Sequence, residues 1–187
     1  MRALRQWRAL ESLAINLAIN YLLIIPMPSI SDNLKKWSNY DWSEKGDEWS
    51  AIWGGTSNLW NGSVYPRIRN SLPAEHVLEI APGFGRMTQF LKEDAATLTI
   101  VDVTSRCIDA CRERFADDQH IRYVVNDGLS LRDVANETVD FAFSFDSLVH
   151  VELDVMQGYI RELARVLRPK GTAFLHHSNM AAFKKEG

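Results

Sequence analysis

Three apolar runs of this chain carry or end in a carboxylate, and a glycine-bearing turn follows the first of them. Glu79 lies in the run 77–80, which continues into the turn Ala81-Pro82-Gly83-Phe84-Gly85. Glycine in such a turn lets a ligand approach the main chain closely, and N–H groups at the start of a following helix can face that ligand. Asp102 and Asp127 end the second and third runs. The pattern predicts a site for a nucleotide-type cofactor.

The turn fits two cofactors, a dinucleotide and S-adenosylmethionine. The dinucleotide fingerprint G-x-G-x-x-G requires a third glycine. Thr88 stands at that position. The alternative pattern E-x-G-x-G-x-G matches Glu79, Gly83 and Gly85, with Ala81 in place of its first glycine. The turn alone favours neither cofactor strongly, so the elements around it must decide.

The downstream sequence alternates between apolar runs and helical stretches. In parallel α/β sheets, ligands bind at the carboxyl ends of the strands, near the point where the strand order reverses. We therefore predict an α/β fold with a Rossmann-like, doubly wound, mainly parallel sheet and helices on both faces. Asp102 and Asp127 are expected on one rim, beside the glycine turn. The predicted strands are 77–80, 98–103, 121–128, 139–145 and 171–177, and the predicted helices lie around 106–115 and 156–167.

Over residues 72–179, this succession of motifs resembles the class I S-adenosylmethionine-dependent methyltransferase family. The resemblance implies S-adenosylmethionine as the cofactor. It also implies that Asp102 accepts hydrogen bonds from both ribose hydroxyls and that Asp127 faces the adenine amino group. Ser144 and Phe145 would flank the sulfonium. The implied cofactor residues are Glu79, Ala81, Pro82, Gly83, Phe84, Gly85, Asp102, Val103, Asp127, Gly128, Ser144 and Phe145.

A narrower resemblance is to an uncharacterised bacterial subgroup of small-molecule methyltransferases. It rests on Glu48-Trp49-Ser50, on Trp53-Gly54-Gly55 and on the run 144–150. It implies methyl transfer to an oxygen, or to a nitrogen, of a small molecule such as a sugar or a secondary metabolite.

Candidate groups for this chemistry follow the fourth and fifth predicted strands. We predict His150 as the general base and Asp146 as the group that orients it or holds an acceptor hydroxyl. A packing role for His150 is an equally good interpretation. A base contributes about 10²–10⁴-fold, whereas holding the reactants in line can supply roughly 7–11 kcal/mol, so a base is helpful but not required. Trp53, His176 and His177 are predicted to line the acceptor pocket. Asp146 with the two histidines could hold a divalent metal, but their spacing does not fix such a geometry, and no metal is predicted.

Three alternatives stay open at this point. A nucleic-acid or protein N-methyltransferase would carry Asn/Asp-Pro-Pro-aromatic after the fourth strand, where this chain has Ser144-Phe145-Asp146-Ser147. An NAD-dependent oxidoreductase is disfavoured by Thr88 and by the motif at Asp127. A non-catalytic or truncated cofactor-binding domain would keep the fold without a complete acceptor site.

The chain divides by composition into three segments. Residues 1–30 form a basic and then apolar extension, which we predict as an amphipathic helix or an appended segment, because it is short for a membrane span. An anchor on a membrane surface is the alternative for this segment. Residues 31–71 form a tryptophan-rich helical cap, and residues 72–187 form the cofactor domain. The family's sheet normally has two more strands after the fifth, so we expect a sheet truncated there. The exposed edge would then be covered by the apolar stretch 13–25 or by another copy of the chain, which makes association between copies an expectation.

Composition limits the remaining classes. The chain has 187 residues, enough for one sizeable core. Its 21 Lys and Arg against 24 Asp and Glu give a net charge of −3, which argues against a nucleic-acid partner. Cys107 and Cys111 are expected to be reduced and packed, which indicates a reducing, cytoplasmic compartment. A small-molecule acceptor is the predicted partner, and no membrane contact is expected.

Overall fold

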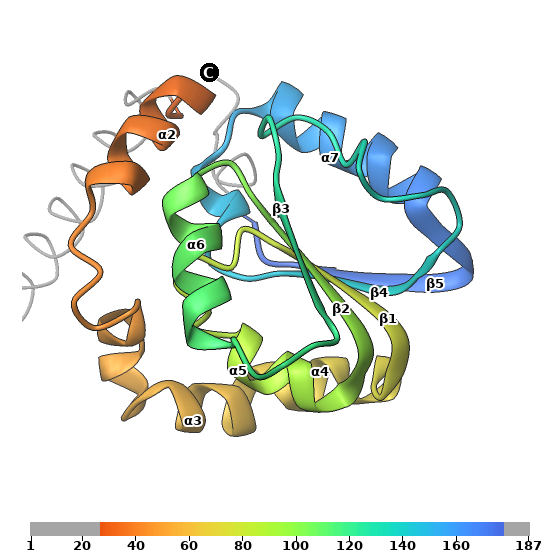
Figure 1. Cartoon of the computed structure of the whole chain (residues 1–187), viewed down its shortest axis with the longest axis horizontal. Coiled ribbons are helices and arrows are strands. Elements are labelled where there is room, and N and C mark those ends of the chain that lie inside the picture. The colour runs from red at the N-terminus through yellow and green to blue at the C-terminus, as the bar shows by residue number, and fades with distance from the viewer. Residues whose placement is uncertain (1–26, 178–187) are drawn as a thin grey trace, which may run out of the picture. The chain divides into compact units, whose positions relative to one another are not determined.

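The computed structural model describes residues 27–177 (Figure 1). Contacts divide the chain into two units, Met1–Met27 with Asn179–Gly187 and, separately, Pro28–Ser178. The second unit contains the sheet and its helices. The predictions for the N-terminal extension up to residue 26, and for the segment after the fifth strand from residue 178 on, lie outside the described residues.

A sheet of five parallel strands forms the centre of the unit, in the order β3-β2-β1-β4-β5. The strand order reverses between β1 and β4, because the chain adds β2 and β3 on one side and returns to add β4 and β5 on the other. This confirms the predicted Rossmann-like fold with its switch point beside β1. The strands are β1 (Ala74–Ile80), β2 (Ala95–Asp102), β3 (Ile121–Val125), β4 (Val139–Ser144) and β5 (Leu167–Leu175).

The central strands are buried on both faces, which is why they read as continuous apolar runs rather than as an alternating pattern. Val77 packs into the core on one face of β1, and its neighbour Leu78 packs into the core on the other face. The first core includes Ile108 of α6 (Ser105–Arg114), and the second includes Leu163 of α7 (Leu153–Val166). The two helices therefore cover opposite faces of the sheet (Figure 1).

The helices begin close to their predicted positions but differ in length. The helix that opens at Thr88 is α5 (Thr88–Leu91), a single turn continued by the 3₁₀ turn η4 (Lys92–Asp94). Helix α6 begins one residue before the predicted stretch, and α7 begins three residues before it. β5 starts directly after α7, and its pairing with β4 is irregular between Val139 and Phe141.

The segment before β1 has two structural parts. Helix α2 (Ile30–Asn39) begins with a capping box between Ser29 and Asp32 and is followed by the 3₁₀ helix η1 (Asp47–Trp53). The second part packs into the first core, where Trp60 stacks on Phe90 with ring centroids 4.9 Å apart. It contains α3 (Thr56–Leu59), the π-helical turn η2 (Trp60–Val64), α4 (Tyr65–Ile68) and the 3₁₀ turn η3 (Arg69–Ser71). Of the segment 31–71 that the sequence predicts as a cap, the first part contributes side chains to the cavity described below, and the second part belongs to the hydrophobic core.

Both cysteines are free and buried in α6, as predicted. Burial raises the pKa of the Cys107 thiol to about 12, so it is neutral near pH 7. Among the helices of the described residues, none is long and apolar enough to cross a membrane.

Candidate cofactor and acceptor site

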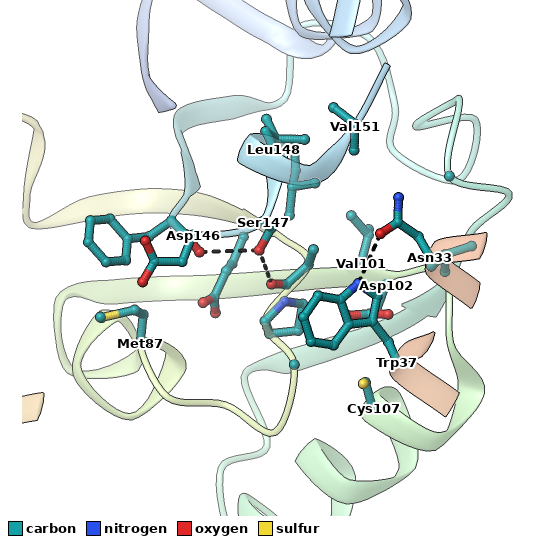
Figure 2. A pocket seen from close by; sticks show the side chains of 18 of the residues that line it. Asn33, Trp37, Met87, Val101, Asp102, Cys107, Asp146, Ser147, Leu148 and Val151 are labelled. Atoms are coloured by element: carbon teal, nitrogen blue, oxygen red, sulfur yellow. Dashed lines mark hydrogen bonds between the residues drawn. The ribbon is translucent and has the colours of Figure 1, made fainter. Parts of the chain in front are cut away.

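A cavity of about 110 Å³ lies at the carboxyl ends of β1, β2 and β4, beneath α2 and η1. Predicted cofactor residues that line it on the β1 and β2 side are Glu79, Ala81, Pro82, Gly83, Asp102 and Val103. Gly128, Phe145 and Asp146 complete the predicted residues on its wall. In Figure 2, Asp102 and Cys107 lie on the same side as Trp37 and Asn33, whereas Asp146 and Met87 lie on the other side.

The turn after β1 takes left-handed backbone conformations at three positions, Ala81 (φ 57°), Gly83 (φ 58°) and Gly85 (φ 84°). Ala81 therefore adopts, with a side chain, the conformation for which the family pattern uses glycine. At Gly83 a Cβ atom would lie 2.9 Å from the Trp42 ring, and at Gly85 it would lie 2.5 Å from Phe115. The two glycines allow the turn to pack closely against the cap on one side and against the end of α6 on the other.

Glu79 and Asp102 are buried carboxylates, with 2% and 6% of their surface exposed. Thr88 Oγ1 donates a 2.6 Å hydrogen bond to Glu79 Oε2. Burial raises the pKa of Glu79 to about 7, and the negative charge of Asp102 adds to the effect. Thr88 stands where the dinucleotide fingerprint has its third glycine, and its hydroxyl group donates this hydrogen bond to Glu79.

Asp102 accepts hydrogen bonds at Oδ1 from the Thr104 amide, at 2.8 Å, and from Thr104 Oγ1, at 2.7 Å. Burial raises the pKa of Asp102, and the bonds from Thr104 oppose that rise. The main-chain N–H groups of Gly83 and Val103 also lower the pKa of Asp102. A carboxylate has about four acceptor positions, so hydroxyl groups of a ligand would share the carboxylate with these donors.

Asp127 lies in the loop after β3, and it is not among the residues that line the cavity. Its carboxylate accepts hydrogen bonds from the amides of Leu129 (2.9 Å) and Ser130 (2.7 Å), and it pairs with Arg132. Burial raises its pKa, but the hydrogen bonds outweigh burial and lower the pKa to about 2. In the structure this carboxylate holds its own loop, and a contact with adenine stays a prediction.

The far side of the cavity holds a chain of polar contacts. Arg86, only 4% exposed, donates from Nη2 to Asp146 Oδ2 at 2.5 Å and from Nη1 to Ser50 Oγ at 2.9 Å. The other carboxylate oxygen of Asp146 lies 2.9 Å from His176 Nδ1. The His176 ring stacks on Phe145 with centroids 4.8 Å apart. Asp146 and His176 are predicted from the sequence for the acceptor side; Asp146 lines the cavity, and His176 adjoins it through Asp146. Arg86, which directly follows the glycine turn, was missed by the sequence analysis.

Several predicted residues lie outside the cavity lining. His150 is half-buried beside Trp37, with ring centroids 5.8 Å apart, and burial lowers the pKa of its imidazole. Its carbonyl accepts a 2.8 Å hydrogen bond from Asn33 Nδ2, which ties α2 to this loop. Trp53 is 53% exposed. The others are His176, which stacks on Phe145, Phe84, which stacks on Trp42, Gly85 beneath Phe115, the fully buried Ser144, and His177, two residues after the end of β5.

The cap contributes three other tryptophans to the wall, Trp37, Trp42 and Trp49. Trp42 stacks on Phe84 at 4.7 Å and nearly parallel, directly over the glycine turn. The many tryptophans of residues 31–71 led to the prediction of a helical cap. Gly46 (φ 87°) lies against two of these rings, since a Cβ atom there would come 3.2 Å from Trp49 and 3.6 Å from Trp42.

Within residues 27–177 no group of three His, Cys, Asp or Glu side chains is arranged to hold a metal ion. Of the groups considered for such a site, Asp146 and His176 are in contact, with Asp146 Oδ1 2.9 Å from His176 Nδ1.

The sheet order, the glycine turn at the switch point and the buried carboxylate beside it define an α/β domain of the class that binds nucleoside-containing cofactors. A family model described as "Methyltransferase domain" matches residues 77–171, half of the chain. The chain belongs to the class I S-adenosylmethionine-dependent methyltransferase family, as its motifs predicted, and S-adenosylmethionine is the cofactor of that family.

Three known proteins show the range of the similarity. The chain is 32% identical over 66 residues to ribosomal RNA small subunit methyltransferase A of Malacoplasma penetrans, covering 34% of this chain and 24% of that protein. Its fold is similar to phosphoethanolamine N-methyltransferase 1 of Haemonchus contortus, solved with phosphoethanolamine and S-adenosylhomocysteine (TM-score 0.59, 24% identity, 77% and 31% coverage). It is also similar to an S-adenosylmethionine-dependent methyltransferase of Mesorhizobium loti (TM-score 0.50, 24% identity, 60% and 53% coverage). The chain spans less than a third of the length of the first two proteins.

The residues around the cavity fit such a cofactor in their chemistry. Asp102 and the main chain of the turn provide polar contacts, and the side chains of Ile30, Val103 and Leu148 provide apolar walls. The volume of about 110 Å³ is small, because ligand pockets measure roughly 300–1,000 Å³.

Proposed function

We propose that this chain transfers the methyl group of S-adenosylmethionine to an oxygen, or a nitrogen, of a small molecule. The observation that carries the proposal is the cavity, which has a buried carboxylate, Asp102, on one side and a clamped carboxylate, Asp146, on the other (Figure 2). One side suits a nucleoside and the other suits a polar acceptor. When bound, the cofactor supplies an electrophilic methyl group.

On the cofactor side, Asp102 would hold both ribose hydroxyls, and each charged hydrogen bond would contribute roughly 1.5–3 kcal/mol. Glu79 would act through the turn, since its hydrogen bond to Thr88 fixes the start of α5. Ala81 and Gly83 would present the main chain to the ligand.

On the acceptor side, Asp146 and Phe145 line the cavity and would position the nucleophile. Positioning alone can supply roughly 7–11 kcal/mol, so it carries most of the proposed rate enhancement. Trp53, His150 and His177 stay predictions for this half of the site. The proposed small-molecule acceptor, a sugar or secondary metabolite in the first instance, rests on the sequence resemblance.

An RNA acceptor is the second candidate, because the rRNA methyltransferase of Malacoplasma penetrans shares 32% identity over 66 residues. The net charge of −3 gives no overall attraction to phosphates and supports the small-molecule proposal. A cytoplasmic location and association between copies are further proposals, resting on the buried free thiols and on the edge position of β5.

Two measurements test the proposal. Calorimetric titration should show binding of S-adenosylhomocysteine and no binding of NAD; the reverse result would identify an oxidoreductase. Methyl-labelled S-adenosylmethionine should then pass its label to a desalted bacterial small-molecule extract and not to total RNA. Label in RNA would establish the second candidate, and binding without any transfer would indicate a non-catalytic domain.

A further inference from the structure

We propose that His176, held by Asp146 and Arg86, is the general base that removes the proton of the acceptor. This inference rests on the proposed function and deepens it. It assigns to His176 the role that the sequence analysis predicted for His150, and it adds Arg86 as a positioning residue.

The hydrogen-bond geometry defines which nitrogen of His176 can act. Two contacts compete at Nδ1: Asp146 Oδ1 lies 2.9 Å away, which suits a proton on Nδ1, and the Asp146 amide donates to the same nitrogen at 3.3 Å, which suits a lone pair there. The contact with the carboxylate is the shorter one and is charge-assisted, so it favours a proton on Nδ1. The lone pair is then on Nε2, which is the nitrogen turned away from Asp146. An imidazole in this tautomer can accept a proton from a ligand, and the carboxylate stabilises the resulting cation.

The backbone at Asp146 supports a functional role. Asp146 has φ of 59°, a left-handed conformation that is strained for most residues with a side chain and that concentrates at functional sites. It also lines the cavity. The strained turn directs the carboxylate back between Arg86 and His176 rather than outward.

Arg86 fixes the other side of the same carboxylate. Its side chain is 5% exposed, and it contacts Asp146 Oδ2 and Ser50 Oγ at once. The guanidinium also lies near the Phe145 ring, 5.6 Å from its centroid, while His176 stacks on that same residue. The charged groups around His176 are therefore Asp146 in direct contact and Arg86 behind it. Both oxygens of Asp146 are engaged, which limits rotation of the carboxylate and so of the imidazole.

His150 has a different environment. Its imidazole is half-buried beside Trp37, and burial together with the nearby Lys36 charge lowers its pKa. Neither histidine is among the residues that line the cavity: His176 adjoins it through Asp146 and Phe145, and His150 adjoins it through Trp37. What distinguishes His176 is its direct contact with a carboxylate, 2.9 Å away. The surroundings of His150 suit packing against α2, which was the other interpretation of its sequence position.

The proposed step conserves atoms and electrons. The lone pair of the acceptor oxygen or nitrogen forms a bond to the methyl carbon, and the bond between that carbon and sulfur breaks with its electron pair going to sulfur. The acceptor's proton passes to His176 Nε2, and Asp146 stabilises the imidazolium. The imidazolium then releases the proton to water.

The first experiment measures the tautomer directly, by ¹⁵N NMR of the histidine rings in the full chain saturated with S-adenosylhomocysteine. We expect His176 to carry its proton on Nδ1, and we expect Asp146→Asn to change that assignment. An Nε2–H tautomer in the unsubstituted protein would overturn the proposal, because Nε2 could then accept no proton.

The second experiment measures label transfer from S-adenosylmethionine to the small-molecule extract. His176→Gln should lower the rate about 10²–10⁴-fold, the usual contribution of a base, and leave the affinity for S-adenosylhomocysteine unchanged. His120→Gln is the matched control, because His120 contacts the Lys92 carbonyl away from the cavity. Full activity of His176→Gln would overturn the assignment of His176 as the base and leave the proposed function intact. The same follows if His150→Gln, and not His176→Gln, shows the loss of rate. Failure of the unsubstituted protein to bind S-adenosylhomocysteine would instead overturn the proposed function itself.

Discussion

The carboxylates at the ends of β1 and β2 and the one after β3 have opposite environments. Glu79 and Asp102 are buried against the cavity, and burial raises the pKa of both. Asp127 lies one strand further out, and donated hydrogen bonds hold its pKa near 2. The sequence context of the two aspartates is the same, an acid that ends an apolar run. The position of a residue at the end of a strand determines where its main chain lies. The hydrogen-bond donors around it determine the orientation of its carboxylate.

The largest expected effect is the contribution of Glu79 to the pH dependence of the free energy of unfolding. Glu79 has a pKa of about 7 in the folded chain against 4.5 as its ordinary value, so the folded state binds its proton more tightly. The stability linked to Glu79 is fully present below pH 4.5 and is lost as pH rises to about 7. At 1.36 kcal/mol for each pKa unit, the loss is on the order of 3 kcal/mol. Urea unfolding of Glu79→Gln between pH 4.5 and 7.5 should lack this decline, and an unchanged decline would place its origin elsewhere.

Asp102→Ala should weaken binding of S-adenosylhomocysteine by about 1.5–3 kcal/mol, or roughly 10- to 150-fold, because charged hydrogen bonds to the ribose are lost. Calorimetry measures the change. Asp102→Asn keeps an acceptor for the Thr104 donors and separates the loss of charge from misfolding. Asp109→Asn is the matched control, since Asp109 is exposed and pairs with Arg112 on the surface of α6. Equal affinity in all three variants would remove Asp102 from the cofactor site.

Asp127→Ala should act mainly on stability. Loss of a side chain that accepts bonds from two loop amides costs about 0.5–2 kcal/mol, by analogy with the removal of a helix cap. The pKa of Asp127 near 2 lies below its ordinary 3.8, so this stability is present above about pH 4 and is lost as pH falls toward 2. The difference between the unfolding temperatures at pH 7 and pH 3 should therefore be smaller for the variant than for the unsubstituted chain. A loss of S-adenosylhomocysteine affinity as large as that of Asp102→Ala would instead support the adenine contact.

The smallest expected effect concerns the turn between these carboxylates. Ala81 has φ of 57°, and a left-handed residue with a Cβ costs roughly 1–2 kcal/mol. Ala81→Gly removes that cost but adds freedom to the unfolded chain worth about 0.4–1 kcal/mol. The net result should be a gain of about 0.5 kcal/mol, measured by urea unfolding. A destabilised variant would show that the Ala81 methyl group contributes more by packing than its backbone costs.

Local patterns predicted the main chain of the site better than its side-chain partners. The apolar runs fixed the strands, and the strands placed the glycine turn, Asp102 and Asp146 around one cavity. The contacts of Arg86 join residues 36 and 60 positions away, so no local pattern specifies them. The choice of Trp42 over Trp53 as a cavity residue depends on how the cap folds back onto the turn.

The contacts of Arg86 affect how the binding of one ligand would change the affinity for the other. The residue directly follows the turn that would carry the cofactor, yet its guanidinium contacts Ser50 of the cap and Asp146 at the acceptor side. A ligand that displaces the turn must also displace both contacts. Binding free energies are then reciprocal: by whatever factor the cofactor tightens the binding of the acceptor, the acceptor tightens the binding of the cofactor. In the proposed reaction, a product of the cofactor that no longer favours this arrangement would weaken the binding of both ligands, and Arg86 would then link substrate binding to product release.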